Sequence, residues 1–274
     1  MRTRQTAGES RPWSRQQLGI ALAGVIFVAA AVITGVAVLV AQAVLSAGID
    51  GGGVAPGGGI ATPPPASVRD RIAAAPMASL DPSAATQPDV ASTPAPAIRL
   101  PGAVEGRGPT SVPVYGPSVE GAVAQLAAID VAVLEAMDVA YTNDVHRAWV
   151  LPGGPTVQQW DLAVNVAAFL RGARQGSTRD AATLVTAAPA GAMVKGVDGP
   201  DWVLACVLLD VRATIQTTHR MGWGHCARMQ WIGDRWRIGP GTPPVPAPSA
   251  WPGSTAAASA GWLTWVSDEQ ELVR

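Results

Sequence analysis

The chain has 274 residues, of which 48% are hydrophobic and only 14% charged, with a formal net charge of −1 and a sequence pI near 6.3. This balance excludes the strongly basic surface of a protein that binds nucleic acid directly. Composition varies strongly along the chain, so only part of it is expected to form a packed globule. The folded part is therefore shorter than the length alone suggests.

An uncharged apolar run extends from Leu18 to Leu45, and its 28 residues exceed the roughly 20 that cross a bilayer. Arginines precede this run, whereas no Lys or Arg follows it until Arg69, so the positive-inside rule predicts a cytoplasmic N-terminus. Ala41-Gln42-Ala43 would fit a signal-peptide cleavage site, but secretory apolar cores of about 7 to 15 residues are much shorter. The sequence predicts a single-pass cell-membrane protein with a basic cytoplasmic tail at 1–17, a transmembrane helix at 18–45 and an extracellular C-terminal domain.

Proline and glycine dominate the segment after the apolar run. Residues 48–113 hold twelve of the 24 prolines and ten glycines, with few large apolar side chains. Such a segment cannot bury enough apolar surface to offset the entropy lost on ordering. We therefore predict a disordered stalk over 46–113, in which a transient helix around Arg69–Leu80 does not count as a domain.

A folded domain is predicted over 114–239, where proline becomes sparse and long apolar patterns begin. Ser118 is placed to cap a first helix, whose apolar residues recur at helical spacing. Thr156 and Gln159 match the capping box that starts a second helix. Three helices are expected, over 118–140, 156–172 and 177–184.

Strand patterns follow the helices, beginning weakly at Ala192–Val197. Between Trp202 and Ile215 apolar residues occupy every odd position, so one face of this strand should be buried. Trp223–Ile232 repeats the alternation, and Gly233-Asp234 supplies a two-residue hairpin turn. That turn pairs residues across the hairpin: Trp231 with Trp236, and Met229 with Ile238.

Helices followed by strands predict an α+β domain, in which three N-terminal helices pack on one face of a curved antiparallel sheet. After Pro240 the sequence is again rich in Pro, Ala and Ser, and a C-terminal tail is expected over 240–274. Its isolated tryptophans are expected to fold back over the domain edge or to contact a partner. They are Trp251, Trp262 and Trp265.

The order of these segments, from the Gly116-Pro117-Ser118 helix start to the closing hairpin at 231–238, resembles the membrane-anchored NTF2-like domains of conjugation and type IV secretion loci. It is similar to the VirB8/TcpC-like proteins of high-GC Gram-positive bacteria over roughly residues 115–239. TcpC-like proteins can carry two such domains, whereas this chain has room for one. Mce-associated membrane proteins share the same plan.

The resemblance implies an NTF2-like fold in a non-catalytic scaffold subunit of a conjugative transfer or type IV secretion-like envelope complex. The expected partners are the membrane, other proteins of the transfer complex and further copies of the chain, with no direct contact to nucleic acid. The alternatives are an extracytoplasmic small-molecule-binding NTF2-like protein and an Mce-associated transport adaptor.

Strong catalytic and cofactor motifs are absent from the sequence, which has no Walker A loop and no G-x-G-x-x-G, G-x-S-x-G, H-E-x-x-H or C-x-x-C. We therefore expect no enzyme activity, no catalytic residue, no cofactor and no metal. His219, His225 and Cys226 lie close in sequence, but a strand would direct His225 and Cys226 to opposite faces, away from a shared ion.

An Asp–His general base in a concave pocket is the sharper enzymatic alternative. It would combine His146 with Asp138, Asp144 or Asp161. The favoured interpretation places Asp144 and His146 in an ordinary loop after the first helix.

Tryptophans and arginines offer two further alternatives. Arg228, Arg235 and Arg237 could form a basic patch on the outer face of the sheet, although a solvated sheet face is the favoured interpretation. Six tryptophans could form a ligand-binding cage, but in a small domain they are expected to be core: Trp149, Trp160, Trp202, Trp223, Trp231 and Trp236.

The two cysteines, Cys206 and Cys226, are both expected outside the membrane, where thiols can be oxidised. A disulfide requires Cα atoms within about 7 Å, which a turn centred near Gln216 would provide. A turn at Arg220-Met221-Gly222 would instead separate the sulfurs by roughly 33 Å along the sheet. Because Thr214–Thr218 is rich in β-favouring residues, the later turn is favoured, and the cysteines are predicted not to be bonded to each other.

Overall fold

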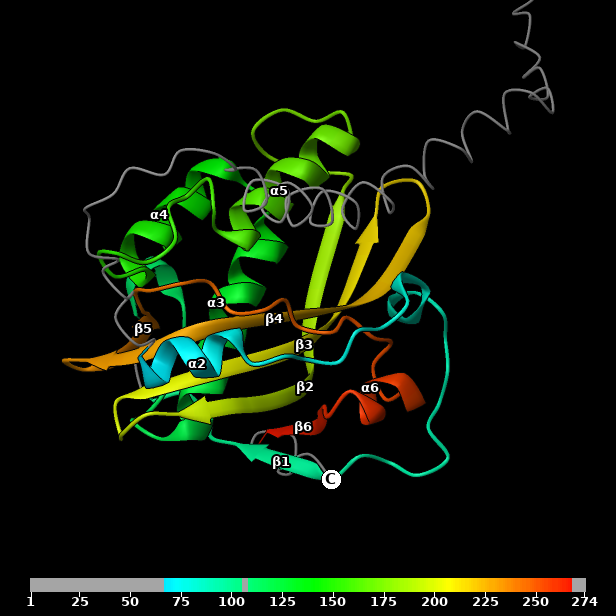
Figure 1. The fold of residues 1–274 in the computed structure, drawn as a ribbon. Helices are drawn as coiled ribbons and strands as arrows, with labels where there is room; N and C mark the ends of the chain where they lie inside the picture. Colours follow the sequence, from blue (N-terminus) through cyan, green and yellow to red (C-terminus); the bar gives the residue numbers. More distant parts are fainter. Residues whose placement is uncertain (1–66, 105–107, 268–274) are drawn as a thin grey trace, which may run out of the picture. The chain divides into compact units, whose positions relative to one another are not determined.

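The computed structural model describes residues 67–104 and 108–267 of the chain. Their fold is α+β, as predicted, and a curled sheet of six strands runs through it in the order β1-β6-β2-β3-β4-β5 (Figure 1). The sheet is mixed rather than antiparallel, because β1 pairs parallel with β6. The strands are β1 (Ala97–Leu100), β2 (Leu184–Val197), β3 (Trp202–Thr214), β4 (Thr218–Ile232), β5 (Arg235–Ile238) and β6 (Leu263–Ser267).

Helices lie on both faces of this sheet. Figure 1 shows α3, α4 and α5 gathered on one side of the strands, with α2 crossing the other. In the described ranges 67–104 and 108–267, no helix is both long and apolar enough to span a bilayer. The tail expected at 1–17 and the span expected at 18–45 lie outside the described residues. The helices are α2 (Val68–Ala74), α3 (Val119–Ala136), α4 (Val139–Trp149), α5 (Asp161–Gly172) and α6 (Thr255–Ser259), with 3-10 turns η1 (Pro82–Ala85) and η2 (Pro109–Ser111).

The first predicted helix, over 118–140, ends earlier than expected, and a separate helix follows it. Ser118 caps α3 as expected, since its Oγ accepts a hydrogen bond from the Gly121 N–H at 2.9 Å. The helix stops before 140, because Met137 adopts the left-handed conformation with φ 42°. Asp138 then caps α4 by accepting from the Tyr141 N–H at 2.7 Å. The loop expected after the first helix is therefore helical.

The other two helix boundaries also differ from the prediction. The Thr156 N–H bonds to Gln159 Oε1 at 3.4 Å, but this contact closes an isolated turn, and α5 begins only at Asp161. The helix expected at 177–184 does not form. There, Asp180 Oδ1 accepts from the Thr183 N–H at 2.8 Å, and β2 starts directly afterwards. Aspartate competes for backbone N–H groups in this way and favours turns over helix interiors.

The closing hairpin is confirmed, with Trp231 opposite Trp236 and Met229 opposite Ile238. The preceding hairpin contradicts the prediction, because β3 and β4 pair from Trp202↔Gln230 to Thr214↔Thr218 around a short turn at 215–217. Gly222 lies inside β4 rather than in a turn. A Cβ at this position would collide with the backbone carbonyl of Ala250, so glycine here permits close approach of the C-terminal segment.

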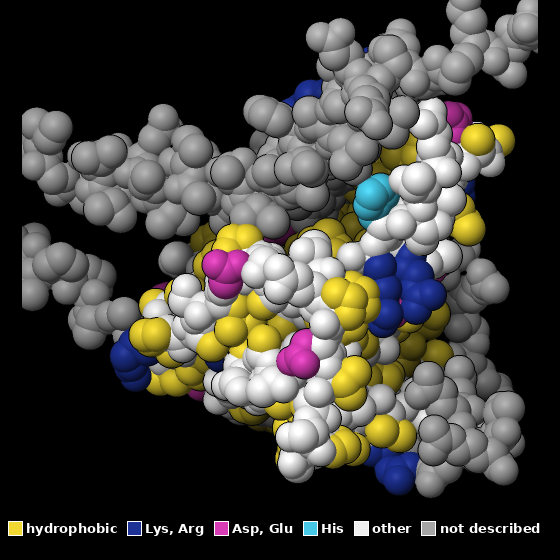
Figure 2. Space-filling view, turned by 90° about the vertical axis from the view of Figure 1, so that its right-hand side faces the viewer, with side chains coloured by type: hydrophobic (Ala, Val, Ile, Leu, Met, Phe, Trp, Pro, Cys, Tyr) yellow, Lys and Arg dark blue, Asp and Glu magenta, His cyan; other side chains and the backbone are white. Residues whose placement is uncertain are grey.

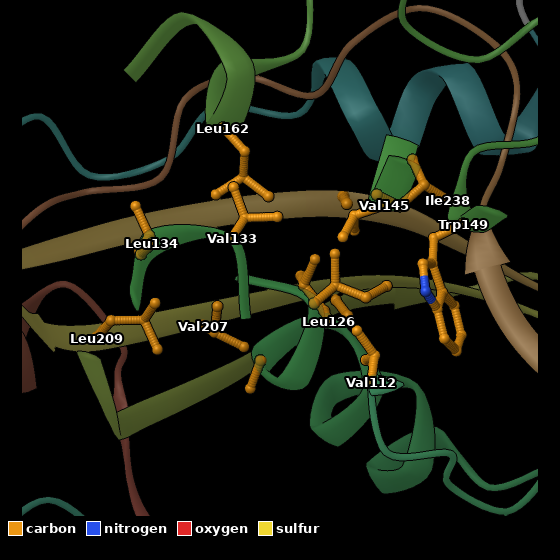
Figure 3. Packing of buried hydrophobic residues seen from close by; sticks show 14 of the residues in the cluster. Val112, Leu126, Val133, Leu134, Val145, Trp149, Leu162, Val207, Leu209 and Ile238 are labelled. Atoms are coloured by element: carbon orange, nitrogen blue, oxygen red, sulfur yellow. The ribbon is translucent and has the colours of Figure 1, made fainter. Parts of the chain in front are cut away.

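The main core lies between the helices and one face of the sheet. Odd residues of β3, such as Val207 and Leu209, meet α3 and α5 there (Figure 3). Leu126 and Val133 of α3 are completely buried, as is Leu162 of α5. Burying side chains of this size contributes roughly 1.5 to 3 kcal/mol each. The apolar odd positions of β3 thus form one buried face, as predicted.

The opposite face of β3 is buried as well, contrary to the prediction of a single buried face. Its even residues Trp202, Leu204 and Leu208 are 1% exposed or less and pack in a second cluster. Two segments far apart in the sequence cover them. They are α2, through Ala73, and the C-terminal segment, through Ala250, Ala257 and Trp262.

This second layer corrects two predicted boundaries. The stalk expected to be disordered over 46–113 is ordered from residue 67 to residue 104 and again from residue 108, and it supplies both α2 and β1. The tail expected over 240–274 supplies α6 and β6, and its own Trp262 is buried, with Nε1 donating to the Pro248 carbonyl at 3.0 Å. Of the three tail tryptophans, Trp262 folds back as expected, but onto a face of the sheet rather than its edge. Trp251 lies against Arg220, and Trp265 belongs to strand β6 itself.

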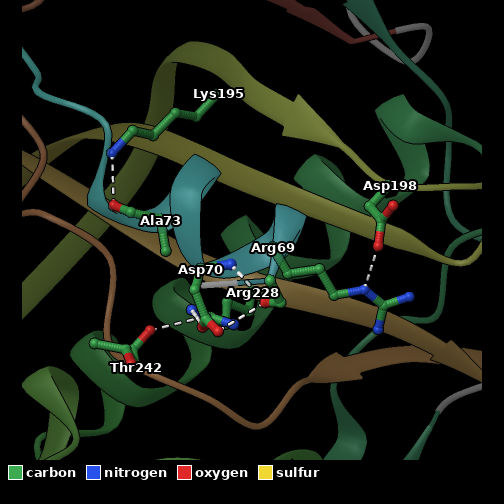
Figure 4. A network of polar contacts seen from close by, with 8 residues as sticks. Arg69, Asp70, Ala73, Lys195, Asp198, Arg228 and Thr242 are labelled. Carbon is green, nitrogen blue, oxygen red and sulfur yellow. Dashed lines mark hydrogen bonds and ion pairs between the residues drawn. The ribbon is translucent and has the colours of Figure 1, made fainter. Parts of the chain in front are cut away.

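Polar contacts fix α2 across the strands (Figure 4). Arg69 Nε lies 2.6 Å from Asp198 Oδ2, and Lys195 Nζ donates to the Ala73 carbonyl at 2.9 Å. Arg228 Nη2 lies 2.6 Å from Asp70 Oδ1. Helix α2, which lies in the segment expected to be a disordered stalk, is therefore part of the same folded unit as the strands.

Candidate functional site

A buried aspartate–histidine pair lies in the helix-covered core. Asp130 is on α3 and His225 is on β4, and the Nδ1 atom of His225 lies 2.8 Å from Asp130 Oδ2. The aspartate is completely buried and the histidine is 5% exposed. Trp223 stacks on the imidazole with ring centroids 5.1 Å apart. Such a pair needs a reason, because burying charged groups is costly unless they are paired.

The two groups change each other's ionisation. Burial raises the pKa of Asp130 above its ordinary value, and the positive charge of His225 only partly opposes this. Burial also disfavours the imidazolium, but the charge and hydrogen bond of Asp130 outweigh it and raise the pKa of His225. Both groups therefore hold protons more strongly than they do in water.

A cavity of about 60 Å³ adjoins the histidine. It lies between β4 and the segment that follows the end of β5 at Ile238. His225 and Arg228 of β4 line it, together with Trp160 and Asp161 at the start of α5. Two buried polar atoms of this region have no partner among the described residues: Asp130 Oδ1 and Trp160 Nε1. An orphaned buried donor or acceptor is rare in native proteins and points to water or a ligand.

The residues of the alternative Asp–His general base do not come together. Asp138 caps α4, and Asp144 forms an exposed ion pair with Arg147 at 2.8 Å. His146 Nε2 lies 2.8 Å from the Pro155 carbonyl. Asp161 is the one candidate at the cavity, and its charge acts on both members of the buried pair.

The sequence nevertheless carried a signal for the pair that was found. Asp130 interrupts the apolar stripe of the first predicted helix, midway between Leu126 and Val133. His225 occupies an odd position of a strand whose odd side chains are otherwise apolar. A charged residue inside a buried stripe implies a partner from another element, although neither pattern alone identifies which one.

The tryptophans are mainly core, as expected. Trp149, Trp160, Trp202 and Trp236 are buried, whereas Trp223 and Trp231 are partly buried. Trp160 is the tryptophan that lines the cavity beside His225. These residues do not form an aromatic cage, because their indoles pack at different places in the two hydrophobic clusters.

The alternative of a basic patch is not confirmed, and the favoured solvated sheet face is wrong for Arg228. Arg228 is 5% exposed and pairs with Asp70 under the second layer. Arg235 bonds to the neighbouring Asp234 at 2.8 Å, and the Nε atom of Arg237 is buried. On the face drawn in Figure 2, hydrophobic side chains lie in small groups among polar ones, and basic side chains gather beside a histidine.

The cysteines are bonded to each other, which contradicts the prediction. Cys206 and Cys226 are directly opposite in the β3–β4 register and form a disulfide. His225 and Cys226 point to opposite faces, as expected, and His219 bonds to Thr217 at the hairpin tip. In the described part of the chain, no three His, Cys, Asp or Glu side chains are grouped to hold a metal ion.

A shallow groove of about 320 Å³ follows α4 and α5 on the helix-covered side. Six of its ten lining residues are apolar, among them Val139, Val166 and the 45% exposed Val164. The polar members are Thr142, Asn143, Gln158 and Arg171. A scan against protein-family models, a search of curated proteins and a search of solved structures each found no match.

Proposed function

We propose that the described residues form an NTF2-like domain held outside the cytoplasm by the apolar segment at 18–45. In this proposal the chain is a non-catalytic scaffold subunit of a conjugative transfer or type IV secretion-like envelope complex. It would act by self-association and by docking other proteins of that complex beyond the membrane.

The disulfide between Cys206 and Cys226 is the observation that carries the proposed location. Structural disulfides persist in oxidising compartments and are rare in the cytosol. This one lies inside a buried cluster and joins two central strands, so the fold includes it as a structural element. An extracytoplasmic domain agrees with the arginine-rich flank that precedes the apolar segment.

The packing of the domain favours a scaffold over an enzyme. Both faces of β3 are filled with side chains, and the cavity at His225, at about 60 Å³, is far below the 300 to 1,000 Å³ typical of small-molecule pockets. The groove along α4 and α5, at about 320 Å³, is at the lower end of that range, and its exposed, largely apolar lining suits a protein surface. We assign this groove to contact with a second copy of the chain.

Substitution of Val164 by aspartate tests the proposed role. A charge in an apolar contact surface would oppose association, so Val164→Asp should shift the detergent-solubilised chain to the monomer in analytical ultracentrifugation. In the native host, the same variant should lower the frequency of conjugative transfer without slowing growth. Leu184→Asp is the matched control, because Leu184 is 56% exposed and does not line the groove.

Three results would contradict the proposal. They are a wild-type chain that is already monomeric, equal effects of the two variants, or unchanged transfer when the gene is deleted. A reporter enzyme that works only outside the cytoplasm, fused after Gly48, checks the orientation separately. Activity of a fusion that works only inside would exclude an extracytoplasmic domain.

A further inference from the structure

The cavity beside His225 contains a hydrogen-bond donor with no acceptor. Trp160 is 2% exposed, lines the cavity, and its Nε1–H has no partner among the described residues. A buried indole N–H is usually hydrogen-bonded, because an unpaired donor has lost its water without compensation. A ligand oxygen in the cavity would supply the missing acceptor.

His225 provides a second donor on the same cavity. Its Nδ1 is held by Asp130, and in the imidazolium form both ring nitrogens donate, so Nε2–H is the ring donor that Asp130 does not occupy. Asp130 thereby fixes the orientation of the ring. Trp160, which immediately precedes α5, and His225 of β4 thus line the same small space.

The charged groups around the cavity are of both signs. Arg228 lines the cavity, although its own hydrogen bonds go to Asp70 and the Thr242 carbonyl. The cavity also adjoins the start of α5, whose N-cap residue makes no side-chain capping bond. Asp161 is the acidic lining residue, and it is exposed in the first turn, where the helix dipole offsets part of its charge.

We propose that this cavity binds a small carboxylate group, whose oxygens accept hydrogen bonds from Trp160 Nε1 and His225 Nε2. The volume of about 60 Å³ holds roughly four to six water-sized groups, which matches acetate or the end of a longer carboxylate. The carboxylate could belong to a free acid or to the C-terminus of a peptide. The site is independent of the scaffold role and of the groove on α4 and α5.

Indole N–H resonances provide a direct test. The full chain, labelled with ¹⁵N-tryptophan in detergent, is titrated with sodium acetate at pH 6, and the Trp160 resonance is identified by its loss in Trp160→Phe. We expect this resonance to shift saturably, with a dissociation constant of about 1 mM for so small a ligand. The Trp231 resonance, from outside the cavity, should not move.

Variants and competing probes complete the experiment. His225→Gln should weaken acetate binding about tenfold or more, because a charge-assisted hydrogen bond is lost. The control His219→Gln alters a histidine at the hairpin tip and should leave binding unchanged. Acetamide should not bind. Tighter binding of an acetylated dipeptide than of acetate would assign the site to peptide C-termini, and equal or weaker binding would assign it to free acids.

Several outcomes would overturn the carboxylate site. Sodium chloride should not reproduce the shift, and an equal shift with chloride would show a general salt response. If acetamide binds as tightly as acetate, the site does not recognise the negative charge of the carboxylate. A Trp160 resonance that stays fixed at molar acetate, or one that responds equally in His225→Gln, would exclude the site.

Discussion

At the scale of single residues, Asp130 and His225 show how a buried charge can be tolerated. Each group compensates the other inside a core that would accept neither alone. Because both groups are buried on folding, their pKa values differ between the folded and unfolded states. The pair should therefore appear in the dependence of stability on pH.

We expect the free energy of unfolding to fall as the pH rises above about 6.5, the ordinary value for histidine. The pKa values of Asp130 and His225 are both raised in the folded state, so the native protein holds protons that the unfolded chain releases. Stability from His225 is complete below its unfolded pKa and is lost as the pH passes its folded pKa. Denaturant titrations from pH 5 to pH 9 measure this slope.

Asp130→Asn should flatten that slope, because the carboxylate that raises the pKa of His225 is gone. His219→Gln is the matched control and should keep the wild-type slope, since His219 lies at the hairpin tip. A slope that is unchanged in Asp130→Asn would mean that the pair does not control it. If the slope disappears in His219→Gln, the pH dependence of stability comes from His219 and not from His225.

Trp236 is the second residue for which the structure gives a definite expectation. It is completely buried, and its Nε1 donates to the Gly116 carbonyl at 2.9 Å. Trp236→Ala should cost about 3 to 5 kcal/mol of stability, the range for emptying a large aromatic site. Arg235→Ala should cost under about 1 kcal/mol, because Arg235 pairs with the exposed Asp234. Equal losses in chemical denaturation would contradict the burial of Trp236.

At the scale of elements, the β3–β4 hairpin organises the domain. Its residues contact the helices on one face and the second layer on the other, and the disulfide joins its two strands. The register from Trp202↔Gln230 to Thr214↔Thr218 brings the cysteines opposite each other. A shift by one residue would exchange the two faces and break both clusters.

Replacing both Cys206 and Cys226 by alanine should lower stability by about 3 kcal/mol, the loop-entropy value for a sequence separation of 20 residues. Thermal unfolding of the double variant measures the loss. Before that comparison, thiol labelling of the denatured, unreduced chain should find no free cysteine until reductant is added. Two reactive thiols per chain would show that the disulfide is absent.

At the scale of the whole molecule, the sheet lies between two layers of unequal origin. The helices of one layer are contiguous in sequence, from residue 119 to residue 172, whereas the other layer joins segments from before and after the strands. Because α2 and the C-terminal segment cover the same apolar face, the domain needs both ends of its described sequence to be stable.

Ending the chain after Gly241 should expose Trp202, Leu204 and Leu208, which the C-terminal segment helps to cover. We expect this truncation to bind anilinonaphthalene sulfonate and to aggregate, because a large apolar patch becomes accessible. Ending the chain after Ser267 keeps β6 and is the control. Normal solubility and no dye binding after the longer truncation would show that the second layer is dispensable.

The sequence by itself determined the α+β class, the Ser118 cap and the closing hairpin. These features depend on local rules: a capping side chain, alternation along a strand and the conformational freedom of Gly233, which adopts φ 69°. Each rule acts within a few residues, so no information about the rest of the fold was needed.

Only the tertiary structure decided the second layer, the disulfide and the candidate site. Ala, Pro and Gly in the stalk and tail bury little surface alone, and they become ordered because the even face of β3 is apolar and needs cover. Gly222 favours a turn by its sequence, but glycine is needed there because the Ala250 backbone packs against it. Asp130 and His225 are 95 residues apart, and only packing of α3 on the sheet brings them together.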